Sequence, residues 1–349
     1  MQLVFYISGH GFGHASRDVE LIRALVARRP GARILVRTAV ARALFSPLAG
    51  APVEVQAAET DTGLAQIDSL RIDEDESARQ AARFYSTFDA RVTAEAELLQ
   101  RVRADLVVGD IPPLAFAAAE RAGLPSVAVA NFTWDWIYGI YPAFDRWAPE
   151  AIPAITAAYA TATRALRLPL HGGFAPMAGV TRDVPFIARR SGRTRAETRH
   201  ALGIDTGRPV VLSSFGAYGA DLPLERLRTS RHFTFVEPVS TPPPGFLYQD
   251  LVAAADVVVS KPGYGIVSEC VANGTPLLYT SRGRFIEYDL FVAEMPRVLR
   301  CRYLSQEDLL AGDWAEAIEA LLAQPAPPNR SSIDGADVAA QNLIALMDA

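Results

Sequence analysis

The hydrophobic positions of the chain form short apolar runs that alternate with longer segments of helical period. The clearest example begins with Val257 to Val259, an unbroken β-branched run of the kind found in strands buried on both faces. Pro262 and Gly263 end this run, and apolar residues then recur at helical spacing from 266 to 271. Gly274 marks the end of that helix. The pattern predicts a strand, a glycine turn, a helix and a second strand in one right-handed parallel unit.

The same alternation extends along the rest of the chain. Helices are expected at 77–103, 249–255, 306–322 and 338–347, with a capping box at Thr194 and Glu197 opening another. Between the helical segments, apolar runs predict strands at 3–7, 34–36, 106–108, 126–130, 166–168, 210–213, 233–236, 257–259 and 277–279. Strands that alternate with helices are typical of doubly wound parallel sheets.

A segment without period, 171–183, is rich in glycine and proline and predicts an interdomain linker. The expected fold is therefore α/β, with two doubly wound, Rossmann-like domains facing each other across a cleft. We expect an N-terminal, acceptor-side domain at 1–180 and a nucleotide-binding domain at 181–335. A C-terminal helix at 336–349 would then be available to pack back on the N-terminal domain.

Composition limits the classes of partner and the cellular compartment that we expect. The 349 residues suit two domains, half of them are hydrophobic, and the net charge of -5 without basic blocks argues against nucleic acid. Cys270 and Cys301 show neither metal spacing nor a disulfide framework, as in a reducing cytoplasm. The N-terminal run lacks the basic region of a signal peptide, and no apolar run reaches transmembrane length. We expect a cytoplasmic protein, with peripheral membrane contact left open.

Three glycine loops follow predicted strands, at 8–14, 214–219 and 261–265. Where such a loop leads into a helix, free backbone amides and the helix dipole favour a bound diphosphate. Glu269, just inside the helix after the third loop, would reach a ribose hydroxyl. The alternative is a packing turn followed by an exposed glutamate. The first loop departs from the Gly-x-Gly-x-x-Gly spacing, and no acidic residue closes the second strand, which excludes NAD binding.

Two further stretches have competing interpretations. Residues 131–138 mix aromatic and polar side chains after a strand, where open α/β sheets bind ligands. They are either a ligand-binding loop or a loop packed by its own tryptophans. Residues 73–75, Asp-Glu-Asp, precede a predicted helix, and acids there interact with its dipole, so we do not interpret them as a metal site. Lys261 is the single lysine, which reflects either codon bias or a role in the third loop.

Four motifs carry a family resemblance over nearly the whole chain. These are Ser8-Gly-His-Gly-Phe-Gly-His-Ala-x-Arg17, Asn131-Phe-x-Trp-Asp-x-Ile-Tyr138, Asp183-Val-Pro-x-x-x-Arg-Arg190 and Gly263-Tyr-Gly-x-Val-Ser-Glu269. The chain resembles GT-B glycosyltransferases, and most closely the glycosyltransferase-like N-terminal domain of L-arabinokinases. It is more remotely similar to the peptidoglycan N-acetylglucosaminyltransferase and the galactolipid synthases. The phosphate loop of the arabinokinase kinase half is missing, so the resemblance implies the transferase-like module alone.

The resemblance implies roles for individual residues on the donor side. Glu269 would hold the donor ribose, and Ser268 with the amides of Gly263, Tyr264, Gly265 and Ile266 would hold the diphosphate. Glu287 matches positions that contact the donor sugar, and its neighbourhood departs from the glutamine-rich peptidoglycan pattern, which speaks against N-acetylglucosamine. Gly216, in the second glycine loop, is expected on the same side. Arg282 and Arg284 would neutralise phosphate or a sugar carboxylate, or form ordinary surface charge.

On the acceptor side, His14 matches the histidine of the first glycine loop, which would act as a base or contact a phosphate. His10 is the competing candidate. The remaining expected acceptor-side residues are Gly11, Gly13, Arg17, Asn131, Trp134, Asp135 and Tyr138, of which Trp134 and Tyr138 could stack on a sugar ring.

These inferences predict an inverting, metal-independent glycosyltransferase whose nucleotide-diphospho-sugar donor is UDP-linked. No separate cofactor is expected, and the acceptor is a small molecule, a glycan or a lipid. One alternative is a nucleotide-sugar or sugar-binding module without turnover. Another is a hydrolase or epimerase that acts on the same donor.

Overall fold

A computed structural model describes residues 1–204, 206–216, 219–237 and 245–348. The chain divides into two compact units. Unit 1 comprises Met1–Ala65, Ile72–Ile187 and Ser332–Ala349, whereas unit 2 comprises Gln66–Arg71 and Ala188–Ser331. The predicted linker residues lie in unit 1, where they form the 3-10 helix η2 (Ala175–Val180) and an edge strand, β7 (Thr181–Asp183).

In the described part of unit 1, seven parallel strands form one sheet in the order β3-β2-β1-β4-β5-β6-β7. Every residue of β4 and β5 is buried, as the continuous apolar runs predict for strands covered on both faces. The other strands are β1 (Gln2–Ile7), β2 (Arg33–Thr38), β3 (Val53–Ala57), β6 (Arg164–Arg167) and β7, with β4 at Leu106–Asp110 and β5 at Ser126–Ala130.

The sheet order reverses direction at β1, and right-handed crossovers therefore place α1 and α4 on opposite faces. The helices of unit 1 are α1 (Phe12–Arg28), η1 (Arg42–Leu48), α2 (Glu74–Tyr85), α3 (Phe88–Arg101), α4 (Pro113–Ala122), α5 (Trp134–Tyr138), α6 (Pro142–Trp147), α7 (Ala151–Ala160), η2 and α15 (Gly335–Met347). The expected helix at 77–103 is thus two helices, because residues 86 and 87 break it.

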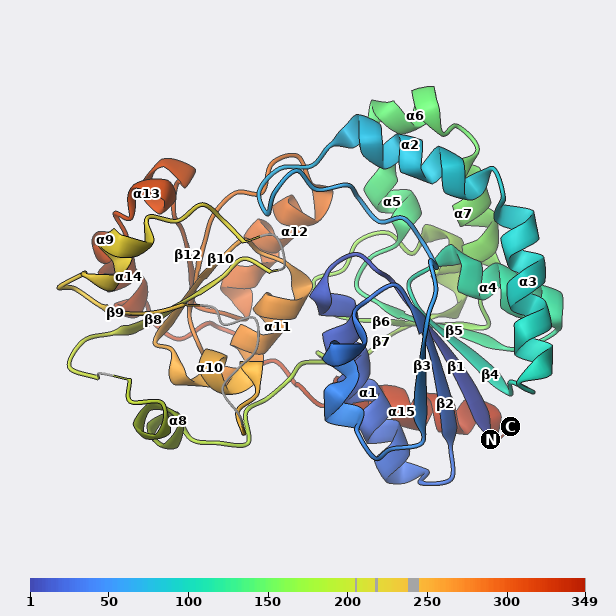
Figure 1. Cartoon of the computed structure of the whole chain (residues 1–349), viewed down its shortest axis with the longest axis horizontal. Helices are drawn as coiled ribbons and strands as arrows, with labels where there is room; N and C mark the ends of the chain where they lie inside the picture. Colours follow the sequence, from blue (N-terminus) through green and yellow to red (C-terminus); the bar gives the residue numbers. More distant parts are fainter. Residues whose placement is uncertain (205, 217–218, 238–244, 349) are drawn as a thin grey trace. The chain divides into compact units, whose positions relative to one another are not determined.

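The C-terminal helix α15 packs beside α1 within unit 1 (Figure 1). Arg28 pairs with Asp337 at 2.8 Å, and Arg29 pairs with Asp348. The helix starts at Gly335, where a Cβ atom would lie only 2.1 Å from the Pro185 carbonyl oxygen. Only glycine allows this close approach, which fixes where the chain re-enters unit 1.

Unit 2 contains five parallel strands in its described residues, in the order β12-β11-β10-β8-β9. The strands are β8 (Val210–Ser214), β9 (Thr234–Val236), β10 (Val257–Ser260), β11 (Leu277–Tyr279) and β12 (Cys301–Tyr303). The helices are α8 (Arg195–Ala201), α9 (Leu224–Arg228), α10 (Tyr248–Ala254), α11 (Tyr264–Asn273), α12 (Ile286–Glu294), η3 (Met295–Arg297), α13 (Gln306–Ala311) and α14 (Ala315–Leu322). β10 is central, as its wholly buried run predicts.

The expectation of two doubly wound α/β units is confirmed. β3 escaped prediction because it is an edge strand with alternating polar residues and no fully buried position. Part of the second glycine loop, Ala217 and Tyr218, and the proline-rich stretch 238–244 lie outside the described residues.

Candidate functional site

In unit 2, the turn from β10 into α11 presents a positively polarised helix end. Gly263 is the N-cap in an extended conformation, and α11 begins at Tyr264. No described side chain caps this end, and the first turn contains no acidic residue. The first amides of a helix have no partner within the helix, so together with the dipole they favour an anion here.

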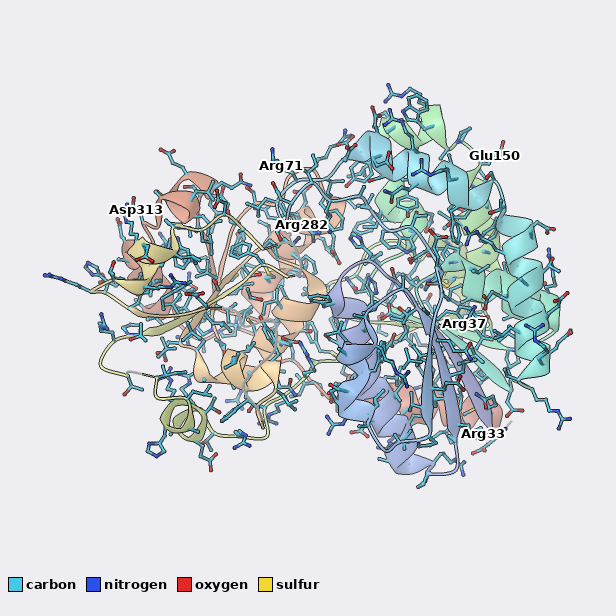
Figure 2. All side chains as sticks on the ribbon, viewed as in Figure 1. Arg33, Arg37, Arg71, Glu150, Arg282 and Asp313 are labelled. Atoms are coloured by element: carbon cyan, nitrogen blue, oxygen red, sulfur yellow. The ribbon has the colours of Figure 1, made fainter. Side chains whose placement is uncertain are left out.

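Two cationic side chains lie at this same turn. Arg282 lies on the connection between β11 and α12 (Figure 2). It is buried and donates from Nη1 to the Pro262 carbonyl oxygen at 3.2 Å. Its Cζ lies 3.8 Å from the centre of the Phe285 ring. Burial, together with the charge of Arg282, lowers the pKa of Lys261 to about 7, against a smaller opposing effect of Asp68. The Lys261 ammonium lies 3.4 Å from Oε1 of Gln66.

Glu269 lies inside α11 and is only 3% exposed. Its Oε1 accepts a hydrogen bond of 2.6 Å from Nε of Arg189, and Nη2 of Arg189 pairs with the same oxygen. The side-chain amide of Asn273 donates to the backbone carbonyl groups of both residues, at 2.8 Å for Glu269 and 3.1 Å for Arg189. The residue expected to bind ribose is therefore held by Arg189, which belongs to the motif at 183–190 but was not predicted to contact Glu269.

The other expected donor-side residues surround the ends of β10 and its neighbours. Gly216 follows β8 with a φ of +69°, and a Ser260 hydroxyl bond to the Ser214 carbonyl ties the ends of β10 and β8. Ser268 is buried and donates to the Gly265 carbonyl at 2.9 Å. Glu287, in the first turn of α12, is also buried, with its Oε2 3.7 Å from Nη1 of Arg282. Gly265 and Ile266 are in the first turn of α11.

In unit 1, His14 belongs to a buried network at the start of α1. Its Nδ1 lies 2.8 Å from Oδ1 of Asp110, the last residue of β4. Arg17 donates from Nε to Oδ2 of Asp110 at 2.5 Å and from Nη1 to Oδ1 of Asn131 at 2.7 Å. Burial acts to raise the pKa of Asp110, but the charges of Arg17 and His14 and their hydrogen bonds hold that pKa well below its usual range. Asp110 is therefore a carboxylate that orients the imidazole through its Nδ1 atom. The other ring nitrogen, Nε2, does not take part in this contact.

Gly11 and Gly13 shape the loop that begins α1, with Gly11 as the N-cap at a φ of +84°. Asp18, one turn after His14, is fully buried, and neither of its oxygens receives a hydrogen bond from the described residues. Burial raises the pKa of Asp18 well above its usual value, the charge of Asp110 adds to this, and Arg17 opposes it.

The aromatic residues expected on the acceptor side are packed inside unit 1. Trp134 is 0% exposed and Tyr138 is 1% exposed. The Trp134 ring stacks on Tyr138 at 5.2 Å between centroids, and Tyr138 stacks on Phe144 at 4.1 Å. Tyr138 also donates to the Gly63 carbonyl at 2.9 Å. Residues 134–138 form the short helix α5, and the structure does not present either ring for stacking on a sugar.

Two other candidates are less enclosed. Asp135 is partly exposed, with its Oδ1 buried and without a hydrogen-bond partner in the described chain. His10 is partly exposed, accepts a hydrogen bond of 3.2 Å at Nδ1 from the Leu64 amide, and meets the Trp134 ring edge-on at 5.3 Å. His10 and His14 thus share one loop but have different partners.

A polar cavity of about 410 Å³ in unit 1 was not predicted. Its lining includes Asp61, which follows β3 and accepts a hydrogen bond of 2.9 Å from Nε1 of Trp134. Burial raises the pKa of Asp61, while hydrogen bonds from Ser8 and Trp134 and the charge of His14 oppose that rise. The full lining is Gly9, Ala39, Glu59, Asp61, Thr62, Gln80, Arg83, Phe84 and Arg91. Apart from Gly9, which lies in the first glycine loop, these residues belong to none of the four motifs.

Among the described residues, no group of three or more His, Cys, Asp or Glu side chains could hold a metal ion. Asp73 of the Asp-Glu-Asp stretch instead caps α2, accepting a hydrogen bond from the Glu76 amide at 2.9 Å. None of the helices in the same residues has the length and apolarity needed to cross a membrane.

Comparisons with known proteins agree with the motifs. The chain is 32% identical to L-arabinokinase from Arabidopsis thaliana over 356 residues, which cover 97% of this chain and 34% of that protein. The chain thus spans about a third of the length of this relative. No family model matches the chain. The predicted resemblance to L-arabinokinases and to GT-B glycosyltransferases is confirmed.

Solved structures show the same fold at low sequence identity. The glycotransferase of kitacinnamycin matches with a TM-score of 0.60 and 18% identity, over 99% of this chain and 98% of its own. UGT2 of Phytolacca americana, in complex with UDP-2fluoro-glucose and pterostilbene, matches with a TM-score of 0.58 and 14% identity, over 99% and 94%. The chain therefore has the two-domain α/β GT-B fold.

Proposed function

We propose that this chain is a glycosyltransferase that moves a sugar from a nucleotide-diphospho-sugar to an acceptor hydroxyl, with inversion and without a metal ion. The observation that carries this proposal is the uncapped end of α11 with Arg282 and Lys261 beside it. Two cations near a positive helix end repel each other, and a bound diphosphate would relieve that repulsion. The GT-B fold supports the same activity, since it is the fold of the matched glycosyltransferases.

Unit 2 would bind the donor. The amides of residues 263–266 and the guanidinium of Arg282 would contact the two phosphates. Glu269 would accept hydrogen bonds from ribose hydroxyls, which would take the place of Arg189 on its carboxylate. Glu287 would contact the donor sugar. A UDP-linked donor agrees with the Phytolacca americana structure, which contains UDP-2fluoro-glucose, and a dTDP-linked donor is the alternative.

Unit 1 would supply the base. Nε2 of His14 would take the proton of the acceptor hydroxyl, and the oxygen would attack the anomeric carbon on the face opposite the diphosphate. The bond between that carbon and the phosphate oxygen would break, and its electron pair would leave with the nucleoside diphosphate. Asp110 would stabilise the imidazolium, and the end of α11 would stabilise the leaving group without a metal ion.

Nucleotide binding tests the donor half of this proposal. We expect UDP to raise the melting temperature of the chain, because ligand at a hundred times its dissociation constant adds about 2.7 kcal/mol. Arg282→Gln should weaken UDP binding about tenfold, or about 1.4 kcal/mol, whereas Arg302→Gln, at an exposed arginine of β12, should not. If UDP and dTDP both fail to bind, the proposal is wrong.

Turnover measurements test the transfer reaction itself. Release of intact UDP from UDP-sugars should require an acceptor, and it should persist in EDTA. Release without any acceptor would indicate a hydrolase. Loss in EDTA that Mg²⁺ or Mn²⁺ restores would contradict the metal-independent mechanism.

A further inference from the structure

The cavity of unit 1 has a lining that is polar and electrically balanced. Arg83 and Arg91 contribute two positive charges, and Glu59 and Asp61 contribute two negative charges. Gln80 and Thr62 add neutral hydrogen-bonding groups. Ligand pockets of ~300–1,000 Å³ are usually lined mainly by apolar side chains. Here only Ala39 and Phe84 among the lining residues have apolar side chains.

The charges of the lining are also paired locally, so the cavity does not favour an ion. Nη2 of Arg91 lies 2.8 Å from Oε2 of Glu59, and its Cζ lies 4.3 Å from the centre of the Phe84 ring. Arg83 pairs with Glu76 at 2.8 Å. A cationic or anionic ligand would have to displace one of these pairs. A neutral ligand rich in hydroxyl groups could instead add hydrogen bonds to them, because carboxylates accept and guanidinium and amide groups donate.

The cavity adjoins the loop that carries the proposed base. Gly9 lies on that loop and lines the cavity, and its amide donates to Oδ1 of Asp61 at 3.4 Å. Asp61 is buried, and its other carboxylate oxygen accepts from Nε1 of Trp134 at 2.9 Å. The contact between Gly9 and Asp61 therefore connects the cavity with the loop that carries His14.

We propose that this cavity binds a neutral saccharide or polyol as the acceptor of the transferase. This inference rests on the proposed function and names its acceptor class. One hydroxyl of the bound saccharide would lose its proton to His14 and form the new bond to the anomeric carbon, while the bond to the nucleoside diphosphate breaks. The polar lining disfavours a planar, apolar acceptor, because burying polar groups without hydrogen bonds costs free energy.

The experiment measures binding to the whole chain by saturation-transfer NMR and calorimetry. The probes are D-glucose, D-galactose, L-arabinose and myo-inositol, with pterostilbene as the apolar comparison. Two variants alter the cavity: Gln80→Leu removes hydrogen-bonding groups at similar size, and Glu59→Gln removes a charge. Matched controls on α3 outside the cavity are Gln100→Leu and Glu97→Gln, both at exposed positions.

We expect at least one saccharide or polyol to bind, and each cavity variant to weaken it about tenfold while the controls leave it unchanged. The same compound should accelerate UDP release from a UDP-sugar. If pterostilbene binds better and the cavity variants do not affect it, the acceptor class is wrong. UDP binding by the same sample then shows that the proposed function stands. If a saccharide binds the cavity but no UDP-sugar or dTDP-sugar turns over with it, the acceptor role is wrong.

Discussion

The imidazole of His14 and the carboxylate of Asp110 meet at 2.8 Å inside unit 1, although 96 residues separate them along the chain. The strand order of the sheet brings these two residues together. β1 pairs with β4 in parallel, with Ile7 opposite Asp110, so the loop that leads into α1 begins beside the end of β4. Because the carboxyl ends of parallel strands share one edge of a sheet, the loop histidine and the strand aspartate lie together.

The first prediction concerns this pair. His14→Ala should lower turnover roughly 100-fold or more and leave UDP affinity nearly unchanged, since a positioned base contributes to the transition state and not to donor binding. Asp110→Asn should also lower turnover, because it removes the negative charge that orients the imidazole and stabilises the imidazolium. Steady-state rates and calorimetry on the same preparations separate the two effects.

His10→Ala provides the comparison on the same loop. It should retain turnover, because Nδ1 of His10 accepts from the Leu64 backbone amide, whereas Nδ1 of His14 lies 2.8 Å from the Asp110 carboxylate. A fully active His14→Ala together with an inactive His10→Ala would reverse the assignment of the base.

The second prediction concerns the pair of Arg189 and Glu269. Glu269→Ala should weaken UDP binding roughly 10- to 100-fold, since hydrogen bonds to a charged group contribute about 1.5–3 kcal/mol. The variant should scarcely distinguish UDP from 2′-deoxy-UDP, because both changes remove the same contact. Calorimetry on the four combinations measures this coupling. Additive losses would show that Glu269 does not touch the ribose.

Arg189→Met is the matching change on the other side of the ion pair. It leaves the buried Glu269 carboxylate without this partner, so unit 2 should lose about 3 kcal/mol of stability, the lower end of the effect expected for a buried pair. Bound UDP should restore part of the lost stability if ribose hydroxyls replace the Arg189 guanidinium at the Glu269 carboxylate. Equal destabilisation with and without UDP would contradict that exchange.

Local sequence patterns located the glycine loops, the buried strands and the residues at the strand ends. They could not pair His14 with Asp110, because that contact depends on β4 lying next to β1 in the sheet. They also left Trp134 with two interpretations, which its burial against Tyr138 distinguishes. The partner of Glu269 comes from residue 189, outside the helix that carries it. The spacing of hydrophobic residues indicates which helices and strands form. These contacts depend instead on how elements that are distant in the sequence pack together.

The third prediction concerns Asp18, whose pKa burial raises well above its usual value. The folded state therefore holds a proton that the unfolded state releases near pH 4. The stability that this group contributes is fully present below about pH 4 and is lost as pH rises towards the folded pKa. Asp18→Asn has a similar size and does not titrate. The variant should therefore gain stability relative to the wild type as pH rises from 4 to 8.

Thermal unfolding across that pH range measures the difference, with Asp145→Asn as a control at an exposed aspartate of α6. The control should show no such trend. Strong destabilisation of Asp18→Asn at every pH would indicate that Asp18 is ionised and paired in the folded protein.

The last prediction uses the single lysine of the chain. Burial and the charge of Arg282 lower the pKa of Lys261 to about 7, so in the folded chain this ammonium loses its proton around pH 7 and not around the usual lysine value of 10.5. In the absence of ligand, the unfolded chain therefore binds more protons between pH 7 and pH 10.5. The cost of the buried charge is therefore fully present below pH 7 and is relieved as pH rises.

A diphosphate bound at the end of α11 would reverse the effect of Arg282 and raise the pKa of Lys261. UDP binding at pH 8 should then take up a proton, and UDP affinity should fall about tenfold from pH 7 to pH 9, or about 1.4 kcal/mol. The charge of the diphosphate itself is nearly constant there, because its last pKa is near 6. Calorimetry in HEPES and Tris, which have different ionisation enthalpies, measures the uptake of the proton.

Two variants test whether Lys261 is the titrating group. Lys261→Met should bind UDP weakly and without proton uptake, whereas Lys261→Arg should bind UDP with an affinity that does not depend on pH. Proton uptake that persists in Lys261→Met would place the titrating group elsewhere and separate Lys261 from the diphosphate.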